Sequence, residues 1–183
     1  LVERGDKSVV PALRKQALSS TASVPNRLQA LWIMEGLGAL DEEALVNVMN
    51  DPSPKLRVTA IRLSEPALAA GNPSAIERVS GRMNDPSREV RLQVALSLGE
   101  APASERGAAL ATLLRNDAGS PFVIPAVVSS LAGEEFAFLE RLSSEREWRE
   151  AGRGYPNVFE ALAAAVLREG DEQKVSRLFQ MVR

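Results

Sequence analysis

Two nine-residue stretches of this chain are closely similar, and this internal repeat limits the fold more than any other feature. Asn50–Val58 reads NDPSPKLRV and Asn84–Leu92 reads NDPSREVRL, a spacing of 34 residues from Asn50 to Asn84. A weaker copy begins at Asn116, 32 residues further on. Self-similarity at a period of this length is typical of proteins that stack copies of one supersecondary unit. We therefore expect a repeat protein.

The residues on either side of each copy have the periodicity of amphipathic helices. Apolar residues recur at i, i+3, i+4 and i+7 before each copy, and the residues after it have a broader apolar face. The apolar positions are Leu45, Val48 and Met49, then Leu56, Ala60, Ile61 and Leu63 around the first copy, and Ile76, Val79 and Met83, then Val90, Val94, Ala95 and Leu98 around the second. Each repeat therefore predicts a half-exposed first helix and a more deeply buried second helix.

Residues that commonly start helices occur at the expected beginnings of several of these helices. Ser53-Pro54 and Ser120-Pro121 each place an N-cap hydroxyl before a proline, which suits the first helical position. There is no sustained alternating run of β-branched residues, so no strand is predicted. We expect five helix pairs and one final helix, at residues 6–19 with 25–38, 41–50 with 54–69, 73–83 with 87–100, 103–115 with 120–132, 135–148 with 156–169, and 171–183. Pro11, Pro66 and Pro125 fall inside these ranges and predict kinks.

Composition argues against several kinds of chemistry. The 183 residues include no Cys and no His, which removes disulfides, thiolate zinc sites and nucleophile–base pairs that use either residue. The formal charge is −2, with Lys and Arg scattered among Asp and Glu, so no basic field for phosphate binding is visible. No stretch is long and apolar enough for a membrane span. We therefore expect no cofactor, no metal, and no nucleic-acid or membrane partner.

The repeated turn resembles that of the HEAT-repeat family, whose units are two antiparallel helices of about this length. The resemblance rests on an Asp in the turn and an apolar-Arg pair early in the second helix, here Asp51 with Leu56-Arg57 and Asp85 with Val90-Arg91. It implies a right-handed all-α solenoid over residues 1–183, with about five helix pairs and a terminal helix. It also implies that Asp51, Arg57, Asp85 and Arg91 form a structural ladder between neighbouring repeats. Val123 stands where the next Arg would be, so one rung is expected to be missing.

A narrower resemblance concerns the helical-repeat segment of large bacterial proteins that join a sugar-dehydrogenase-like propeller to a c-type haem domain. The stretches Arg27–Gly38 and Arg62–Glu65 are similar to that segment. It implies an extracytoplasmic spacer between redox domains, whereas without it a cytoplasmic location is expected. The chain begins at Leu1, which favours a fragment of a longer protein, and residues 171–183 then predict the first helix of an unfinished sixth pair.

The second helices of a solenoid line one concave face, where a partner binds. Polar positions in otherwise apolar second helices, together with one aromatic residue, predict which side chains reach it: Gln29, Trp32, Thr59, Arg62, Gln93, Ser97 and Ser129. The apolar neighbours of Trp32 favour packing in the core or between repeats over exposure on this face. Leu96 is expected to be buried, whereas substitution of Gln93 should cost little.

A non-catalytic scaffold that binds a protein or a flanking domain is the function that these features favour. Two alternatives remain open. One is a spacer that sets the distance between flanking domains. The other is a HEAT-like DNA glycosylase, an enzyme class that needs neither His nor Cys, against which the absence of a basic stripe argues.

Overall fold

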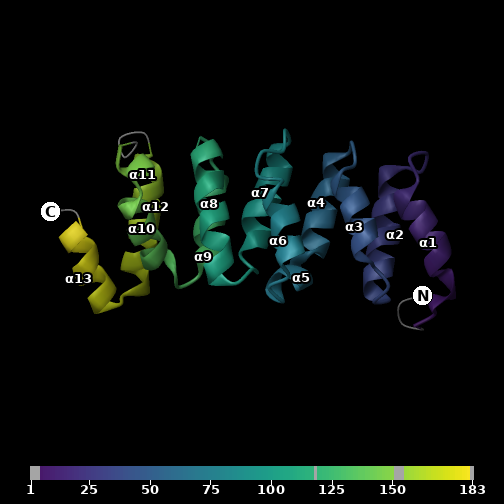
Figure 1. Ribbon diagram of the computed structural model, residues 1–183, viewed down its shortest axis with the longest axis horizontal. Coiled ribbons are helices and arrows are strands. Elements are labelled where there is room, and N and C mark those ends of the chain that lie inside the picture. Colours follow the sequence, from purple (N-terminus) through teal and green to yellow (C-terminus); the bar gives the residue numbers. More distant parts are fainter. Residues whose placement is uncertain (1–4, 118, 151–154, 182–183) are drawn as a thin grey trace.

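A computed structural model describes residues 5–117, 119–150 and 155–181, and these form an elongated stack of helices (Figure 1). No strand occurs among the described residues, which confirms the all-α prediction. A 3-10 helix, Lys7–Val9, precedes helices with the following bounds: α1 Val10–Leu18, α2 Val24–Gly36, α3 Glu42–Met49, α4 Pro54–Leu63, α5 Glu65–Ala69, α6 Pro73–Ser80, α7 Arg88–Leu98, α8 Ala103–Asp117, α9 Val123–Leu131, α10 Glu135–Ser144, α11 Arg146–Glu150, α12 Pro156–Glu169 and α13 Glu172–Met181.

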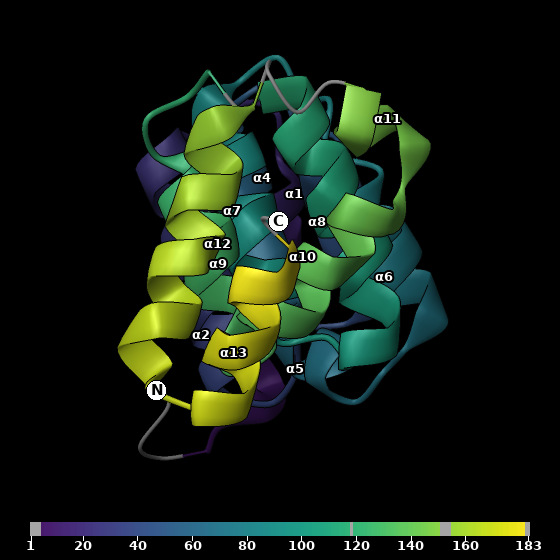
Figure 2. The same cartoon turned by 90° about the vertical axis from the view of Figure 1, so that its left-hand side faces the viewer.

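The helices form two layers, which are visible when the stack is viewed from its C-terminal end (Figure 2). One layer holds the second helices of the pairs, α2, α4, α7, α9 and α12, and each of them packs against the next. The other layer holds the first helices α1, α6, α8 and α10, together with α3, which packs on both α1 and α4. Helix α13 packs on α12. We call the solvent side of the second helices the second-helix face.

Side chains cap α3 and α6, whereas the two predicted serine caps differ from the prediction. Ser53 is the N-cap residue of α4 but makes no side-chain cap hydrogen bond, and Ser120 lies two residues before Phe122, the N-cap residue of α9. The Asp41 carboxylate accepts a hydrogen bond of 2.7 Å from the Ala44 N–H, and the Asn72 side chain accepts one of 3.1 Å from the Ala75 N–H. Each contact satisfies a backbone donor that has no partner inside the helix. Gly170 ends α12 at a φ of 76°, a left-handed conformation that glycine adopts without strain.

The three prolines that predicted kinks behave differently. Pro66 breaks the long predicted helix, because α4 ends at Leu63 and α5 begins at Glu65. For Pro11 and Pro125 the prediction was wrong, because α1 and α9 begin later than expected. Both prolines therefore lie in the first turn of a helix, where the missing N–H has no intrahelical partner in any case.

The core is a continuous apolar layer between the two helix layers. Its largest fully buried aliphatic side chains come from α2, α4, α5 and α7 to α10: Leu31, Met34, Leu56, Ile61, Leu68, Leu98, Leu110, Leu113, Leu114, Leu131 and Leu142. Trp148 is also fully buried, and its ring packs against Tyr155 with centroids 4.9 Å apart. Each pair buries its apolar surface against its neighbours, as expected for a repeat stack.

Trp32 and Leu96 are two of the six large hydrophobic residues that are exposed among the described residues, and for both the prediction of burial was wrong. Leu96 is 42% exposed rather than buried, and Trp32 is 43% exposed rather than packed inside. A buried residue follows each of them two positions later, Met34 in α2 and Leu98 in α7. Two positions correspond to a rotation of about 200°, so Trp32 and Leu96 lie on nearly the opposite side of the helix from these buried residues. A second helix contacts its own first helix and both neighbouring second helices, so its fourth side remains open, and these two residues occupy that side.

Inter-repeat ladder and candidate interaction face

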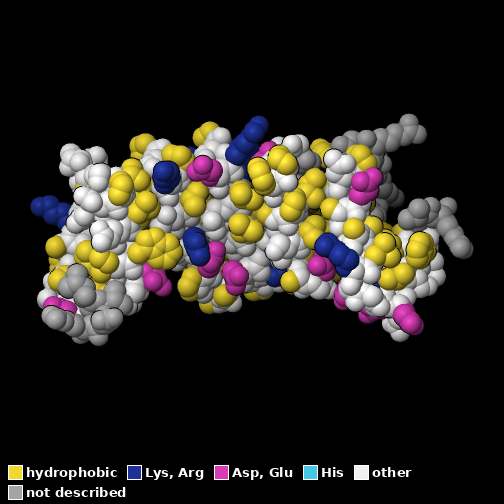
Figure 3. All heavy atoms as spheres, turned by 180° about the vertical axis from the view of Figure 1, so that it is seen from behind, with side chains coloured by type: hydrophobic (Ala, Val, Ile, Leu, Met, Phe, Trp, Pro, Cys, Tyr) yellow, Lys and Arg dark blue, Asp and Glu magenta, His cyan; other side chains and the backbone are white. Residues whose placement is uncertain are grey.

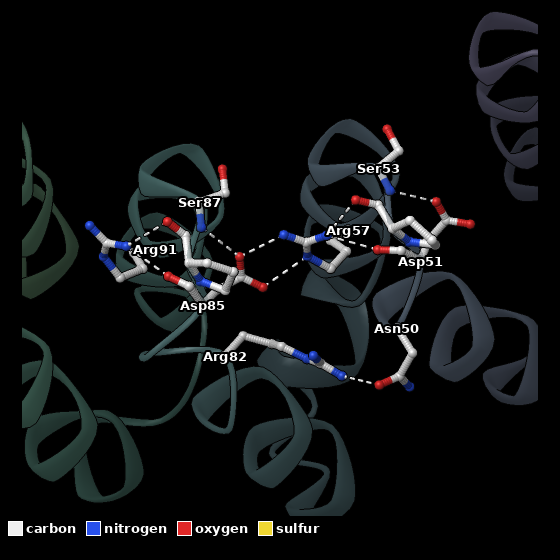
Figure 4. A network of polar contacts seen from close by, with 10 residues as sticks. Asn50, Asp51, Ser53, Arg57, Arg82, Asp85, Ser87 and Arg91 are labelled. Atoms are coloured by element: carbon white, nitrogen blue, oxygen red, sulfur yellow. Dashed lines mark hydrogen bonds and ion pairs between the residues drawn. The ribbon is translucent and has the colours of Figure 1, made fainter.

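Arg57 connects the turn of its own repeat to the turn of the next (Figure 4). Its Nε donates to Asp85 Oδ2 at 2.8 Å and its Nη2 donates to Asp85 Oδ1 at 2.7 Å. Its Nη1 donates to the backbone carbonyls of Asp51 and Pro52 at 2.8 and 3.0 Å. Asp85 Oδ1 also accepts from the Ser87 N–H at 2.9 Å. Arg57 and Asp85 are both buried, so the pair is a hydrogen-bonded ion pair shielded from water.

The same contact recurs on both sides of this pair. Arg91 Nε donates to Asp117 Oδ2 at 2.7 Å, and its Nη1 donates to the Asp85 carbonyl, also at 2.7 Å. Arg27 Nη2 donates to Asp51 Oδ2 at 2.5 Å. The structure thus brings Asp51, Arg57, Asp85 and Arg91 into one row, in which each arginine pairs with the aspartate of the following repeat.

Arg27 and Asp117 complete this row, although the sequence analysis did not include them in the ladder. Arg27 was detectable from its spacing. The arginines of the row are all the fourth residue of their helices, and each follows an N-cap serine by four positions: Ser23, Ser53 or Ser87. Phe122 is the N-cap residue of α9, and the buried Val123 begins that helix. The row therefore receives no arginine from α9.

The ionisation of Asp85 is set by the ladder. Burial raises the pKa of its carboxyl, but the hydrogen bonds from Arg57 and from the Ser87 N–H lower it by more. The pKa of Asp85 therefore lies below its ordinary value of 3.8. The carboxylate stays ionised at neutral pH, and the buried guanidinium of Arg57 keeps its counter-charge.

The residues predicted for the concave face divide into two groups. Gln29, Trp32, Arg62 and Ser129 are exposed, and Gln93 is half-buried. Thr59 and Ser97 are buried instead. Thr59 Oγ1 donates to the Lys55 carbonyl of its own helix at 2.9 Å, and Ser97 Oγ donates to Glu65 Oε1 at 2.8 Å. The Thr59 hydroxyl finds its partner within its own helix and the Ser97 hydroxyl finds one in the preceding repeat, so a polar residue in a second helix does not have to reach solvent.

Two adjoining hollows lie on the second-helix face. The first, of about 390 Å³, is lined by Trp32, Glu35, Arg62, Leu63, Glu65, Pro66, Ala69 and Glu100. The second, of about 600 Å³, is lined by Arg62, Glu65, Gln93, Leu96, Gly99, Glu100, Arg106, Ser129, Ser130 and Ala132. Because they share Arg62, Glu65 and Glu100, we treat them as one groove and call it the Arg62 groove. It brings together the predicted residues Trp32, Arg62, Gln93 and Ser129.

Charge and apolar surface are mixed on the second-helix face. Figure 3, which views the stack from this side, shows hydrophobic side chains along the whole length, with Lys or Arg and Asp or Glu side chains between them. In the groove, the guanidinium carbon of Arg62 lies 5.8 Å from the centre of the Trp32 ring, within the range of a cation–π contact. The groove can therefore contact both apolar and charged groups of a partner.

Glu35, Glu65 and Glu100 line this groove, and the sequence analysis missed all three. They come from three different helix pairs, and only the packing of these pairs brings them together. Within the described parts of the chain, no group of three or more Asp, Glu, His or Cys is placed to hold a metal ion. The described helices also include none that is long and apolar enough to cross a membrane.

A comparison with protein-family models matches residues 42–132 to a family of HEAT repeats. The matched segment contains all of α3 to α9 and both complete copies of the repeated turn. The comparisons with curated proteins and with solved structures give no match. The family match, the paired helices and the two-layer stack agree, and the chain belongs to the HEAT-repeat family.

Proposed function

We propose that this chain is a non-catalytic scaffold whose second-helix face binds a protein or a neighbouring domain. One observation carries the proposal: Trp32 and Leu96 are both large, apolar and exposed, and both line the Arg62 groove. Aromatic side chains that combine with polar neighbours on an open surface are typical of protein interfaces. HEAT-like stacks use extended faces of this kind for binding.

The ladder supports this function by fixing the surface. The row of ion pairs links four successive helix pairs in a set order, because the arginines of α2, α4 and α7 each contact the first helix or the turn of their own pair and the aspartate of the next pair. The order of the repeats that line the groove is therefore set before a partner arrives. Binding to such a preorganised surface avoids part of the entropic cost of ordering it.

Site-specific photo-crosslinking tests the scaffold function. A photoreactive amino acid replaces Leu96 in the groove or, as a control, the exposed Ala108 on the first helix α8. We expect position 96 to form a defined adduct with one protein or domain, and excess unlabelled chain to compete with its formation. Position 108 should not form this adduct. Equal labelling from both positions, or no competition, would contradict the proposal.

A spacer is the second candidate function, and the continuous ladder favours it because a bonded row stiffens the stack. Two variants separate the functions in cells that depend on the protein. Trp32→Ser with Leu96→Ser changes the groove without changing length. Deletion of residues 51–84 removes one period and joins Asn50 to Asp85, which restores the repeated turn. A scaffold loses function in the double variant, whereas a spacer loses function only in the deletion.

A further inference from the structure

We infer that the Arg62 groove binds a basic segment of its partner, in which Lys or Arg side chains lie beside apolar ones. This inference rests on the proposed function and specifies the chemistry of the partner. It follows from three features of the groove: an excess of carboxylates, the ends of the helices that line it, and an apolar wall with an aromatic ring.

Carboxylates outnumber the free cations of the groove. Among the residues that the structure describes, Glu35, Glu65 and Glu100 face one groove cation without an ion pair, Arg62, because the other cation, Arg106, pairs with Glu134 at 3.0 Å. Within the described residues, the carboxylates of Glu35 and Glu100 have neither a hydrogen bond nor an ion pair. Two carboxylates are therefore available to a partner, and they favour a cation by charge complementarity.

The third carboxylate is held in place. Glu65 Oε1 accepts from Ser97 Oγ at 2.8 Å, and Gln93 Nε2 donates to the same Ser97 oxygen at 2.9 Å. Ser97 is fully buried, so the carboxylate of one repeat is fixed by a hydroxyl inside the next. A carboxylate fixed in this way can receive a cation without losing further side-chain freedom.

The groove also lies at the C-terminal ends of the second helices. Helix α2 ends at Gly36, α4 at Leu63 and α7 at Leu98, and the lining residues cluster around these ends. Unpaired carbonyls give a helix C-terminus a partial negative charge, which attracts cations. Arg106 shows this preference, because its Nη1 donates to the carbonyls of Gly99 and Ala101, just beyond the end of α7.

Apolar residues beside these charges suit the aliphatic part of a Lys or Arg side chain. Leu63, Pro66 and Ala69 line the wall next to the Trp32 ring. Long basic side chains commonly bury their methylene groups against such a wall while the charged end reaches a carboxylate. Arg62 already places its guanidinium near Trp32, so the ring attracts a cation of this type.

The spacing of the helices suggests how the basic residues are arranged. Packed helices lie about 8–10 Å apart, and an extended segment in the polyproline conformation covers this distance in about three residues. Residues three apart also point to the same side of such a segment. A partner that crosses from α2 over α4 to α7 therefore needs basic side chains at positions i, i+3 and i+6, one for each of Glu35, Glu65 and Glu100.

Three synthetic peptides test the inference by isothermal titration calorimetry. They share one apolar and Ser-containing sequence and differ only at positions i, i+3 and i+6, which carry Lys, Gln or Glu. We expect the Lys peptide to bind more tightly than the Gln peptide, the Glu peptide not to bind, and the affinity of the Lys peptide to fall with added salt. Equal affinities for the three peptides, or no binding of the Lys peptide, would overturn the inference.

Substitutions in the chain test whether the peptide occupies this groove. Glu35→Gln and Glu100→Gln should each weaken Lys-peptide binding roughly two- to fivefold, as expected for exposed ion pairs. Arg62→Gln should strengthen binding, because it removes a like charge. Glu77→Gln changes an exposed residue of α6 outside the groove and should have no effect. Unchanged binding in both Glu35→Gln and Glu100→Gln, or weaker binding in Arg62→Gln, would overturn the inference.

The two proposals fail in distinguishable ways. A competed crosslink at position 96 together with no preference for the Lys peptide would leave the scaffold function intact and remove only the basic partner. Absence of the crosslink would instead count against the scaffold function itself. The substituted groove residues are exposed on the surface, so we expect every variant to stay folded. Circular dichroism of each variant tests this and excludes unfolding as the cause of lost binding.

Discussion

Arg57 and Asp85 are 28 residues apart in sequence and are joined by two hydrogen bonds across the boundary between the second and third helix pairs. Both side chains are almost completely removed from solvent. The same arginine also binds two carbonyls of its own turn. This one side chain therefore couples the conformation of a turn to the position of the neighbouring repeat. Its loss should lower the free energy of unfolding by more than the loss of a surface ion pair does.

Asp85→Asn should lower the free energy of unfolding by roughly 3–5 kcal/mol, because it leaves the buried guanidinium of Arg57 without a counter-charge. Glu43→Gln is the matched control, since it breaks an exposed ion pair with Arg14 and should cost less than about 1 kcal/mol. Urea denaturation measures both values. Similar losses in the two variants would show that the buried pair contributes no more than a surface pair.

Stability should fall in acid partly through Asp85. A carboxyl whose pKa is lower in the folded state binds protons more readily when unfolded, so its contribution is complete above the unfolded pKa. That contribution is lost as the pH decreases below about 3.8 and through the lower folded pKa. Urea titrations between pH 7 and pH 2 measure the effect. Asp85→Asn should lack this part of the acid dependence, and an unchanged pH profile in the variant would contradict the assignment.

Leu98→Ser and Leu96→Ser should differ sharply although they change the same residue type in one helix. Leu98 is fully buried, and its loss creates a cavity and buries a hydroxyl, at a cost of roughly 3–5 kcal/mol. Leu96 is exposed, so its substitution should cost at most about 1 kcal/mol. Thermal unfolding followed by circular dichroism compares them. Equal destabilisation would mean that Leu96 packs inside the stack.

The glycosylase alternative makes a separate prediction about DNA. We expect no base release and no sub-micromolar binding to duplex DNA at physiological salt, because the second-helix face mixes both signs of charge instead of presenting a basic stripe (Figure 3). Fluorescence anisotropy with a labelled duplex measures the binding. Tight binding that weakens steeply with added salt would favour the enzyme over the scaffold.

The periodicity of the sequence was sufficient to predict the helix pairs, because apolar spacing and N-cap residues act within single helices. It was not sufficient to predict which side of a second helix remains open. Trp32 and Leu96 are apolar and occur among apolar residues, so pattern alone assigned them to the interior. Their exposure depends on how closely the neighbouring pairs approach, and this is a property of the assembled stack.

The positions of the polar residues in the groove could not be predicted from the sequence pattern either. Ser97 was predicted as a surface residue, but it lies inside and holds Glu65. The partners Glu65 and Ser97 are 32 residues apart, and no local spacing connects them. Arg27 is the opposite case, because its distance from the N-cap Ser23 matches that of Arg57 from Ser53 and could have been recognised.

All the ladder arginines lie near the N-terminal ends of the second helices, whereas the Arg62 groove lies at the C-terminal ends. The stack therefore carries its row of buried ion pairs along one edge and is hollowed along the other. Bending about the edge with the ion pairs would change the separation between Trp32 and Leu96 while the ion pairs stay closed. A partner that contacts both residues would then set the curvature of the whole array, and the array would resist partners of the wrong length.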